Sequence, residues 1–366
     1  MMEKFDPNAA AKEDSGIFGL PQVSPHTEKE AALVFIPVPW EATTSYRKGT
    51  AQGPEAILAA SHQVDLFDLD VRNPYESGFF YLPESVEVRK WNEEARPLAE
   101  KIIDVGGDLE VIQADSDLFG ALKRVNALGE RVNQYVYRET KTVLDGGKIP
   151  AIVGGDHSVP FGAIQAASER YRDLGVLHFD AHSDTRKAYE GFAWSHASIM
   201  RNVMEKIPGI KKLVQVGIRD LCDEEVDFTF LNRNRIVTHY DRDLQRRKFE
   251  GVSWGSLCRE ILSTLPNEVW VSFDIDGLDP RFCPNTGTPV PGGLDFQEAV
   301  YLIDLVVRSG RKIVGFDLNE VAPAPVRPES PGSSESKDEW DANVGARLLY
   351  KMSGLTLVSQ NRAKFN

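Results

Sequence analysis

Short apolar runs alternate with longer amphipathic stretches along most of this chain. The stretches with helical periodicity lie at residues 118–144, 161–170, 254–265 and 296–307. The apolar runs lie at residues 33–36, 149–153, 175–179, 213–218, 269–273 and 313–316. Such alternation is typical of βαβ units, and continuous apolar runs indicate strands that are buried on both faces. We therefore expect an α/β fold with a parallel sheet between two helix layers.

Length and composition are consistent with one large domain. The chain has 366 residues, of which 42% are hydrophobic, and α/β sheets of this length often form a single unit. We interpret residues 1–30 as an irregular N-terminal arm and residues 31–366 as one domain. Within it, the charged segment 64–112 is expected to form an excursion. Residues 322–339, rich in Pro and Ser, are expected to form an exposed loop.

The charge balance limits the partners that this chain can have. The net charge is −13 and no basic stripe is present, which argues against a nucleic-acid partner because a phosphate backbone must meet a basic surface. A small cationic substrate suits this charge better. The polar N-terminus and the lack of an apolar run near the ~20 residues of a membrane span predict a cytoplasmic protein without a membrane partner. The three cysteines are expected to be reduced thiols.

Histidine and aspartate residues cluster where three of the predicted strands end. Asp180, His182 and Asp184 alternate after one strand, so an extended backbone would turn their side chains to one side. Asp274 and Asp276 repeat this spacing after another strand, and His157 follows a third. A mixed His/Asp set without thiolate favours Mn, Co, Ni or Zn, and burying these carboxylates without a cation would be costly. A polar turn is the alternative for each motif alone, but three coinciding motifs favour a site for two divalent ions.

Four ordered motifs resemble the ureohydrolase family of arginases, agmatinases and guanidino-acid hydrolases. They lie at residues 154–158, 180–184, 272–280 and 287–293, and the resemblance extends over roughly residues 30–360. It implies a three-layer α/β/α sandwich with an eight-stranded parallel sheet. It also implies two divalent metal ions, with Mn²⁺ as first choice and Ni²⁺ as in some guanidine-specific members, and a homo-oligomer that is a trimer or hexamer.

The resemblance also implies roles for individual residues. His157 and Asp184 would bind the first metal, His182 and Asp276 the second, and Asp180 and Asp274 both; Asp184 is also placed in the catalytic set. Glu320 would bind the guanidinium group, and His196 would transfer a proton to the leaving amine. The alternatives are an ordinary exposed glutamate and a surface-loop histidine.

Two further polar residues lie next to these motifs. Asp156 is expected to orient the loop that carries His157 rather than to bind metal. His178 is expected to be a packed core histidine without a catalytic role.

The loop after Asp184 departs from the arginase pattern. Tyr189, Phe192 and Trp194 replace small polar residues, and we expect them to form an aromatic lid that binds a cation. Cys222 stands where arginases hold an aspartate, and residues 40–50 are expected at the rim of the same pocket. Agmatine is therefore the first expected substrate, free guanidine the second, and arginine a poor one. The alternative is that the aromatic residues brace a subunit interface.

Two other functional classes remain open at this point. A deacetylase-like amidohydrolase on a related fold would use a single Zn²⁺ ion, so metal stoichiometry separates it from a two-metal enzyme. A non-catalytic relative would usually lack one of the six ligands, and all six are present.

Overall fold

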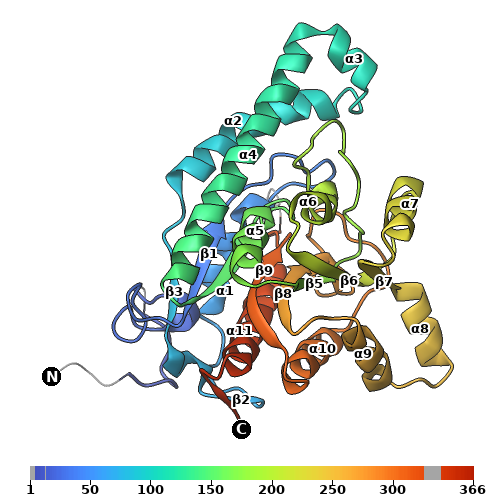
Figure 1. Cartoon of the computed structure of the whole chain (residues 1–366). Coiled ribbons are helices and arrows are strands. Elements are labelled where there is room, and N and C mark those ends of the chain that lie inside the picture. Colours follow the sequence, from blue (N-terminus) through green and yellow to red (C-terminus); the bar gives the residue numbers. More distant parts are fainter. Residues whose placement is uncertain (1–4, 13, 325–338) are drawn as a thin grey trace, which may run out of the picture.

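A computed structural model, which describes residues 5–12, 14–324 and 339–366, shows a parallel sheet between two helix layers (Figure 1). The eight strands are ordered β3-β1-β4-β9-β8-β5-β6-β7, and every neighbouring pair is parallel. The expected α/β/α architecture with eight parallel strands is thus confirmed. The strands of this sheet are β1 (Leu33–Val38), β3 (Phe79–Tyr81), β4 (Ile149–Gly154), β5 (Leu174–Phe179), β6 (Ile210–Ile218), β7 (Ile236–Tyr240), β8 (Glu268–Asp274) and β9 (Lys312–Asn319).

All six apolar runs form strands of this sheet, whereas its two outer strands have no such run. β3 has three residues and β7 is only partly buried, so neither gives a long apolar signal. The short strands β2 (Val71–Arg72) and β10 (Lys364–Phe365) form a separate antiparallel pair.

The helices cover both faces of the sheet. They are α1 (Gly53–Ser61), α2 (Val86–Ile103), α3 (Leu109–Ala114), α4 (Ser116–Asp145), α5 (Phe161–Arg170), α6 (Ile199–Lys206), α7 (Asp223–Leu231), α8 (Asp241–Phe249), α9 (Trp254–Ser263), α10 (Phe296–Arg308) and α11 (Trp340–Ser359). Short 3-10 helices are η1 (Ile17–Gly19), η2 (Thr50–Gln52), η3 (Pro74–Ser77), η4 (His196–Ser198) and η5 (Ile275–Gly277). None of the helices in the described part of the chain is long and apolar enough to cross a membrane.

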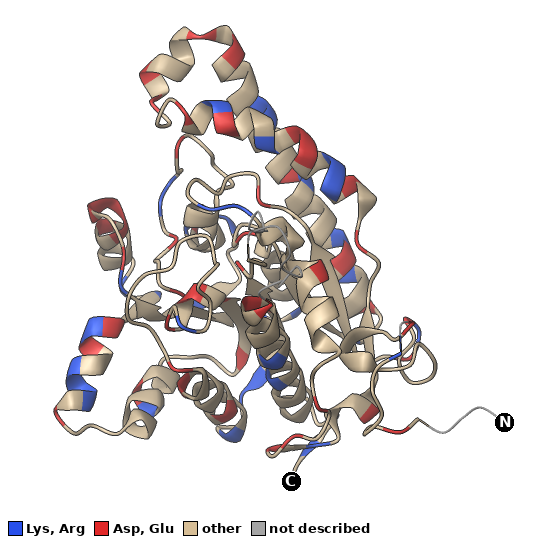
Figure 2. Ribbon diagram, turned by 180° about the vertical axis from the view of Figure 1, so that it is seen from behind, with Lys and Arg blue, Asp and Glu red and all other residues tan. Residues whose placement is uncertain are grey.

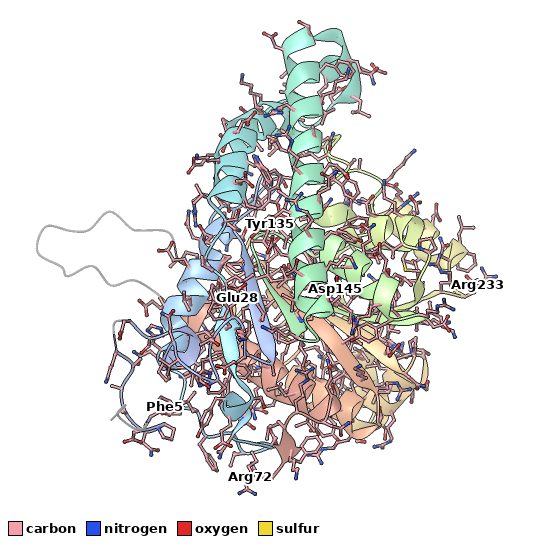
Figure 3. All side chains as sticks on the ribbon, turned by 60° about the vertical axis from the view of Figure 1, so that its left-hand side comes forward. Phe5, Glu28, Arg72, Tyr135, Asp145 and Arg233 are labelled. Carbon is pink, nitrogen blue, oxygen red and sulfur yellow. The ribbon has the colours of Figure 1, made fainter. Side chains whose placement is uncertain are left out.

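Alternate residues of the strands build two hydrophobic cores. Val34 and Ile36 of β1 join the core under α2, α4, α5 and α6, whereas Leu33 and Phe35 join the core under α1, α9, α10 and α11. Figure 3 shows side chains filling the space between the sheet and α4, the helix that carries the labelled Tyr135 and Asp145. Because both faces are covered, only the strand ends are free to carry a site.

The segment 64–112 contains more regular structure than its sequence indicates. It adds β3 to the edge of the main sheet and then forms α2, which packs against α4. The buried face of α2 consists of Val88, Ala95, Ala99 and Ile102 among many charged residues, so its period is weak in the sequence. With α3, these helices project from the body (Figure 1), and Figure 2 shows both signs of charge interspersed along them.

The N-terminal segment is attached to the body by buried apolar side chains. Ile17, Phe18 and Leu20 are at most 2% exposed, and the ring of Phe18 contacts the rings of Phe35 and Tyr350. Residues 1–4 and 13 of the expected arm lie outside the described residues. So do residues 325–338 of the expected exposed loop, whose first residue, Ala322, is buried rather than exposed.

Candidate metal centre

The carboxyl ends of four neighbouring strands carry the polar residues singled out in the sequence. β4, β9, β8 and β5 are consecutive in the sheet and end at the same edge. The helices that follow β4 and β5 pack on one face, and those that follow β9 and β8 pack on the other. Where successive connections leave on opposite faces, a crevice opens beyond the strand ends, and ligands of α/β proteins bind there.

His157 lies at the centre of a first group of donors. Its Nδ1 atom lies 3.0 Å from Oδ2 of Asp180, 3.3 Å from Oδ2 of Asp184 and 3.2 Å from Oδ2 of Asp274. All four side chains are buried. One imidazole nitrogen and three carboxylate oxygens therefore converge on one point, as the ligands of a transition-metal ion would.

His182 forms a second group beside the first. Its Nδ1 atom lies 3.4 Å from Oδ1 of Asp180 and 3.2 Å from Oδ2 of Asp276. Asp180 thus points one oxygen at each histidine, and its carboxylate is shared by the two groups. The three residues have ligand atoms within 4.8 Å of one another, which is the geometry expected of a two-ion site with a shared ligand.

The electrostatics of these groups fit divalent cations. Burial and the charge of Asp180 raise the pKa of Asp184 to about 8, and burial and Asp276 raise the pKa of Asp274 well above its usual range. Burial opposes the charged form of His157, but its hydrogen bonds to Asp180, Asp184 and Asp274 raise its pKa well above 6.5. These side chains therefore retain protons in the metal-free protein, and two dications would replace those protons.

A hydrogen-bond network orients the imidazole of His157. Its Nε2 atom lies 3.0 Å from Oγ of Ser272, which donates to Oδ1 of Asp317 at 2.8 Å. Asp317 also accepts hydrogen bonds from Trp270 and Asn319, and it is fully buried. Because Ser272 donates its proton to Asp317, it accepts from Nε2 of His157, and Nδ1 is the nitrogen whose proton a metal ion would replace. This is the tautomer that a metal ligand needs.

Glu320 lies beside this centre with one carboxylate oxygen free. Oε1 accepts the backbone N–H of His157 at 2.9 Å, whereas Oε2 is buried and has no hydrogen-bond partner among the described residues. A Cβ at Gly287 would come within 3.2 Å of Oε2, so the missing side chain leaves room there. Glu320 and Asp184 also adopt φ values of 62° and 56°, a strained conformation that is common at functional sites.

A cavity of about 260 Å³ opens onto the two donor groups at Asp184 and His182. It is lined by Ser45, Tyr46, His182, Asp184, Arg186, Tyr189, His196, Ala197, Asp220, Leu221, Glu225, Thr288, Pro289 and Val290. Ser45 and Tyr46 confirm that the loop after β1 reaches the rim. The cavity therefore connects the donors to solvent, and its wall contains both polar and apolar side chains.

His196 lies in this cavity and has few polar partners. Its Nδ1 atom lies 3.4 Å from Oγ1 of Thr43, and its ring meets the ring of Tyr189 edge-on at 5.8 Å. Burial and the charge of His182 lower the pKa of His196 to about 3. Its imidazole is therefore neutral here.

The expected three-residue aromatic lid is wrong for two of its members. Tyr189 lines the cavity, but Phe192 is fully buried in the core under α4 and α5. Trp194 packs against Phe161 of α5 and against Gly129 of α4. Apolar surface on these helices, which the loop sequence does not reveal, turns both rings inward.

The structure also shows where the residues beside the motifs lie. Asp156 accepts two hydrogen bonds from Ser158, consistent with a role in orienting its loop. Cys222 does not line the cavity, whereas Asp220 of the same turn does.

His178, expected to be a core histidine, is buried, but its Nε2 atom lies 2.8 Å from Oδ2 of Asp180. The period of two between His178 and Asp180 is the sequence signal for this contact.

The chain is similar to known proteins over most of its length. The model of the arginase family matches residues 31–350. The N(1)-aminopropylagmatine ureohydrolase of Synechocystis is 30% identical over 91% of this chain and 92% of its own length. The agmatinase of Bacillus subtilis is 31% identical over 85% and 89%. The crystal structure of agmatine ureohydrolase of Thermoplasma volcanium has the same fold, with a TM-score of 0.65 and 22% identity over 92% of this chain and 93% of that one.

Proposed function

Because the chain belongs to the arginase family, we propose that it hydrolyses a small guanidino compound to urea with two divalent metal ions. The observation that carries this proposal is the shared carboxylate of Asp180 between His157 and His182. In this proposal, His157 and Asp184 bind the first ion, His182 and Asp276 bind the second, and Asp180 and Asp274 bind both. Mn²⁺ is the first choice and Ni²⁺ the second.

The residues around the centre have complementary tasks. When bound, the two ions would supply a hydroxide nucleophile by lowering the pKa of water toward ~7. Glu320 holds the guanidinium through its free Oε2, which places the carbon in front of the donor groups. His196 accepts a proton and delivers it to the departing amine, because an amine leaves readily only when it is protonated. Its position in the cavity wall supports this role.

The cavity favours agmatine over free guanidine. Guanidine would leave most of the 260 Å³ to water, whereas a guanidinium on a polymethylene chain would extend along Leu221 and Val290. Asp220 lies at the same wall and is exposed, and its carboxylate accepts no hydrogen bond from the described residues. Glu225 instead accepts the backbone N–H groups of Thr185 and Cys222. Asp220 is thus the carboxylate available for the amine of agmatine.

The proposal is tested by urea release from agmatine, guanidine, N1-aminopropylagmatine, guanidinobutyrate and arginine, with protein loaded separately with Mn²⁺ and Ni²⁺. Preference for agmatine supports the proposal. Preference for guanidine with Ni²⁺ would reassign the substrate and leave the chemistry in place. Retention of one Zn²⁺ per chain with no urea from any substrate would instead favour an amidohydrolase, and two bound ions without any turnover would favour a non-catalytic relative.

Asp220→Asn separates recognition of the amine from the chemistry. The variant should raise the KM for agmatine and leave the rate with guanidine unchanged, because guanidine has no second amine. Asp243→Asn, at an exposed position of α8 paired with Arg242, is the matched control and should change neither value.

A further inference from the structure

His178 is the one fully buried histidine near the metal centre to which the proposed function assigns no task. It lies on β5 two residues before Asp180, so both side chains leave the strand on the same side. Its Nε2 atom lies 2.8 Å from Oδ2 of Asp180, the carboxylate shared by the two donor groups. The distance alone allows two roles, a further metal ligand or a hydrogen-bond donor to Asp180.

Gln215 of β6 decides between these roles because its amide can have only one orientation. Its Nε2 atom lies 2.7 Å from the backbone carbonyl of Ser183, which only accepts hydrogen bonds. Rotating the amide would bring two acceptor oxygens together, and it would turn Oε1 away from its donor Thr238. The nitrogen of Gln215 therefore faces both Ser183 and Nδ1 of His178, which is 3.1 Å away.

The orientation of Gln215 sets the tautomer of His178. Because Gln215 donates to Nδ1, that nitrogen carries no proton, and the proton of the neutral imidazole is on Nε2. Nε2 consequently donates to Asp180 and has no lone pair for a metal ion.

The sheet itself holds this arrangement in place. Gln215 pairs with His178, and His178 pairs with Ser272, in the register of adjacent strands. Thr238 and Asp317 extend the same row at its two ends, on β7 and β9. The row thus crosses five neighbouring strands beneath the metal centre and supports both His157 and Asp180.

We propose that His178 is a positioning residue that holds the shared carboxylate of Asp180 in its orientation by donating from Nε2, and that Gln215 sets the tautomer needed for this. The inference rests on the proposed function, since Asp180 is taken as the ligand of two ions. His178 acts through Asp180 and touches no substrate. Hydrogen-bond partners of metal ligands typically change metal affinity by tenfold to a hundredfold when they are removed.

The test is calorimetric titration of the metal-free full chain with Mn²⁺, together with its unfolding temperature. His178→Leu removes the donor, whereas His178→Gln keeps an N–H at the same number of bonds from Cβ. Gln215→Leu keeps the imidazole and removes the donor that sets its tautomer. This second variant tests the inference if His178→Leu does not fold. His26→Leu is the matched control, because His26 is also buried and accepts a hydrogen bond from Phe79 far from the centre.

We expect His178→Leu to weaken Mn²⁺ binding about tenfold to a hundredfold. His178→Gln should restore most of the affinity, and Gln215→Leu should weaken binding by a smaller factor. The control should lower the unfolding temperature and leave the affinity unchanged. Unchanged affinity in both His178→Leu and Gln215→Leu, with two ions bound to the wild type, would overturn the inference alone. A wild-type chain that binds fewer than two ions would overturn the proposed function itself.

Discussion

The backbone N–H of His157 donates a 2.9 Å hydrogen bond to Oε1 of Glu320, which joins a proposed metal ligand to the proposed guanidinium-binding residue. The two residues follow β4 and β9, which are neighbours in the sheet. This bond uses one oxygen of Glu320 and leaves Oε2 without a partner among the described side chains. In the proposed function, this one short contact would fix the separation between the substrate-binding carboxylate and the first metal ion.

Glu320→Gln should lower kcat/KM for agmatine by roughly tenfold to a hundredfold. A hydrogen bond to a charged group contributes about 1.5–3 kcal/mol, and the variant loses the charge that faces the guanidinium. Bound metal, measured by elemental analysis, should be unchanged. Glu205→Gln, at an exposed position of α6, is the control. An unchanged kcat/KM would exclude Glu320 from substrate binding.

Asp274→Asn should abolish turnover and weaken metal retention, because the proposal gives this carboxylate to both ions. The metal-free variant should nevertheless unfold at the same temperature as the wild type or higher, since burial raises the pKa of Asp274 and makes its ionised form unfavourable. Metal content after dialysis and the unfolding temperature check both effects. Near-full activity would show that Asp274 does not bridge.

The metal-free protein should lose stability as pH rises from about 4 to about 8. The folded pKa of Asp184 is about 8 against 3.8 for an ordinary aspartate, so the folded state binds more protons in this range and rising pH favours unfolding. The raised pKa values of His157 and His182 act in the same direction above pH 6.5. Saturating Mn²⁺ should reduce or reverse the slope, because the metal replaces these protons. Unfolding temperatures across this range, with and without metal, would test it; a metal-free protein that gains stability toward pH 8 would contradict it.

His196→Asn should lower kcat by about 10²- to 10⁴-fold, the usual contribution of a general acid or base. KM and metal content should change little, because no hydrogen bond or ion pair joins His196 to the proposed ligands in the described part of the chain. His239→Asn, on β7 and away from the cavity, is the matched control. If kcat stayed within twofold of the wild type, proton transfer would have to be assigned to another group.

Tyr189→Ala should mainly change KM, whereas Phe192→Ala in the same loop should mainly change the free energy of unfolding. Tyr189 lines the cavity, so its loss should raise KM several-fold with a small effect on stability. Phe192 is fully buried, so its loss should lower the free energy of unfolding by about 3–5 kcal/mol. Urea denaturation and steady-state kinetics on both variants test the assignment. Equal effects of the two substitutions on KM would contradict the burial of Phe192 and would support the expectation that it forms part of an aromatic lid.

The sequence alone determined the architecture and the edge of the sheet at which the centre forms. Apolar runs predict parallel strands, and the carboxyl ends of parallel strands must meet at one edge. Asp180 and Asp274 follow two such runs directly, so the order of residues along the chain is enough to place both at this edge. The sequence did not predict the strands β3 and β7, because edge strands bury too little surface to need a long apolar run.

Only the tertiary structure decided which way the side chains of the loops point and which strands are neighbours. Phe192 turns into the core because it meets the apolar surface of α4 and α5, whereas Tyr189 turns into the cavity. The sequence of the loop does not reveal this difference, because the two helices belong to other segments of the chain. The contact of His178 with Gln215 depends on β5 lying beside β6. Orientation and cross-strand contact are properties of packing between distant segments, which no local pattern of residues specifies.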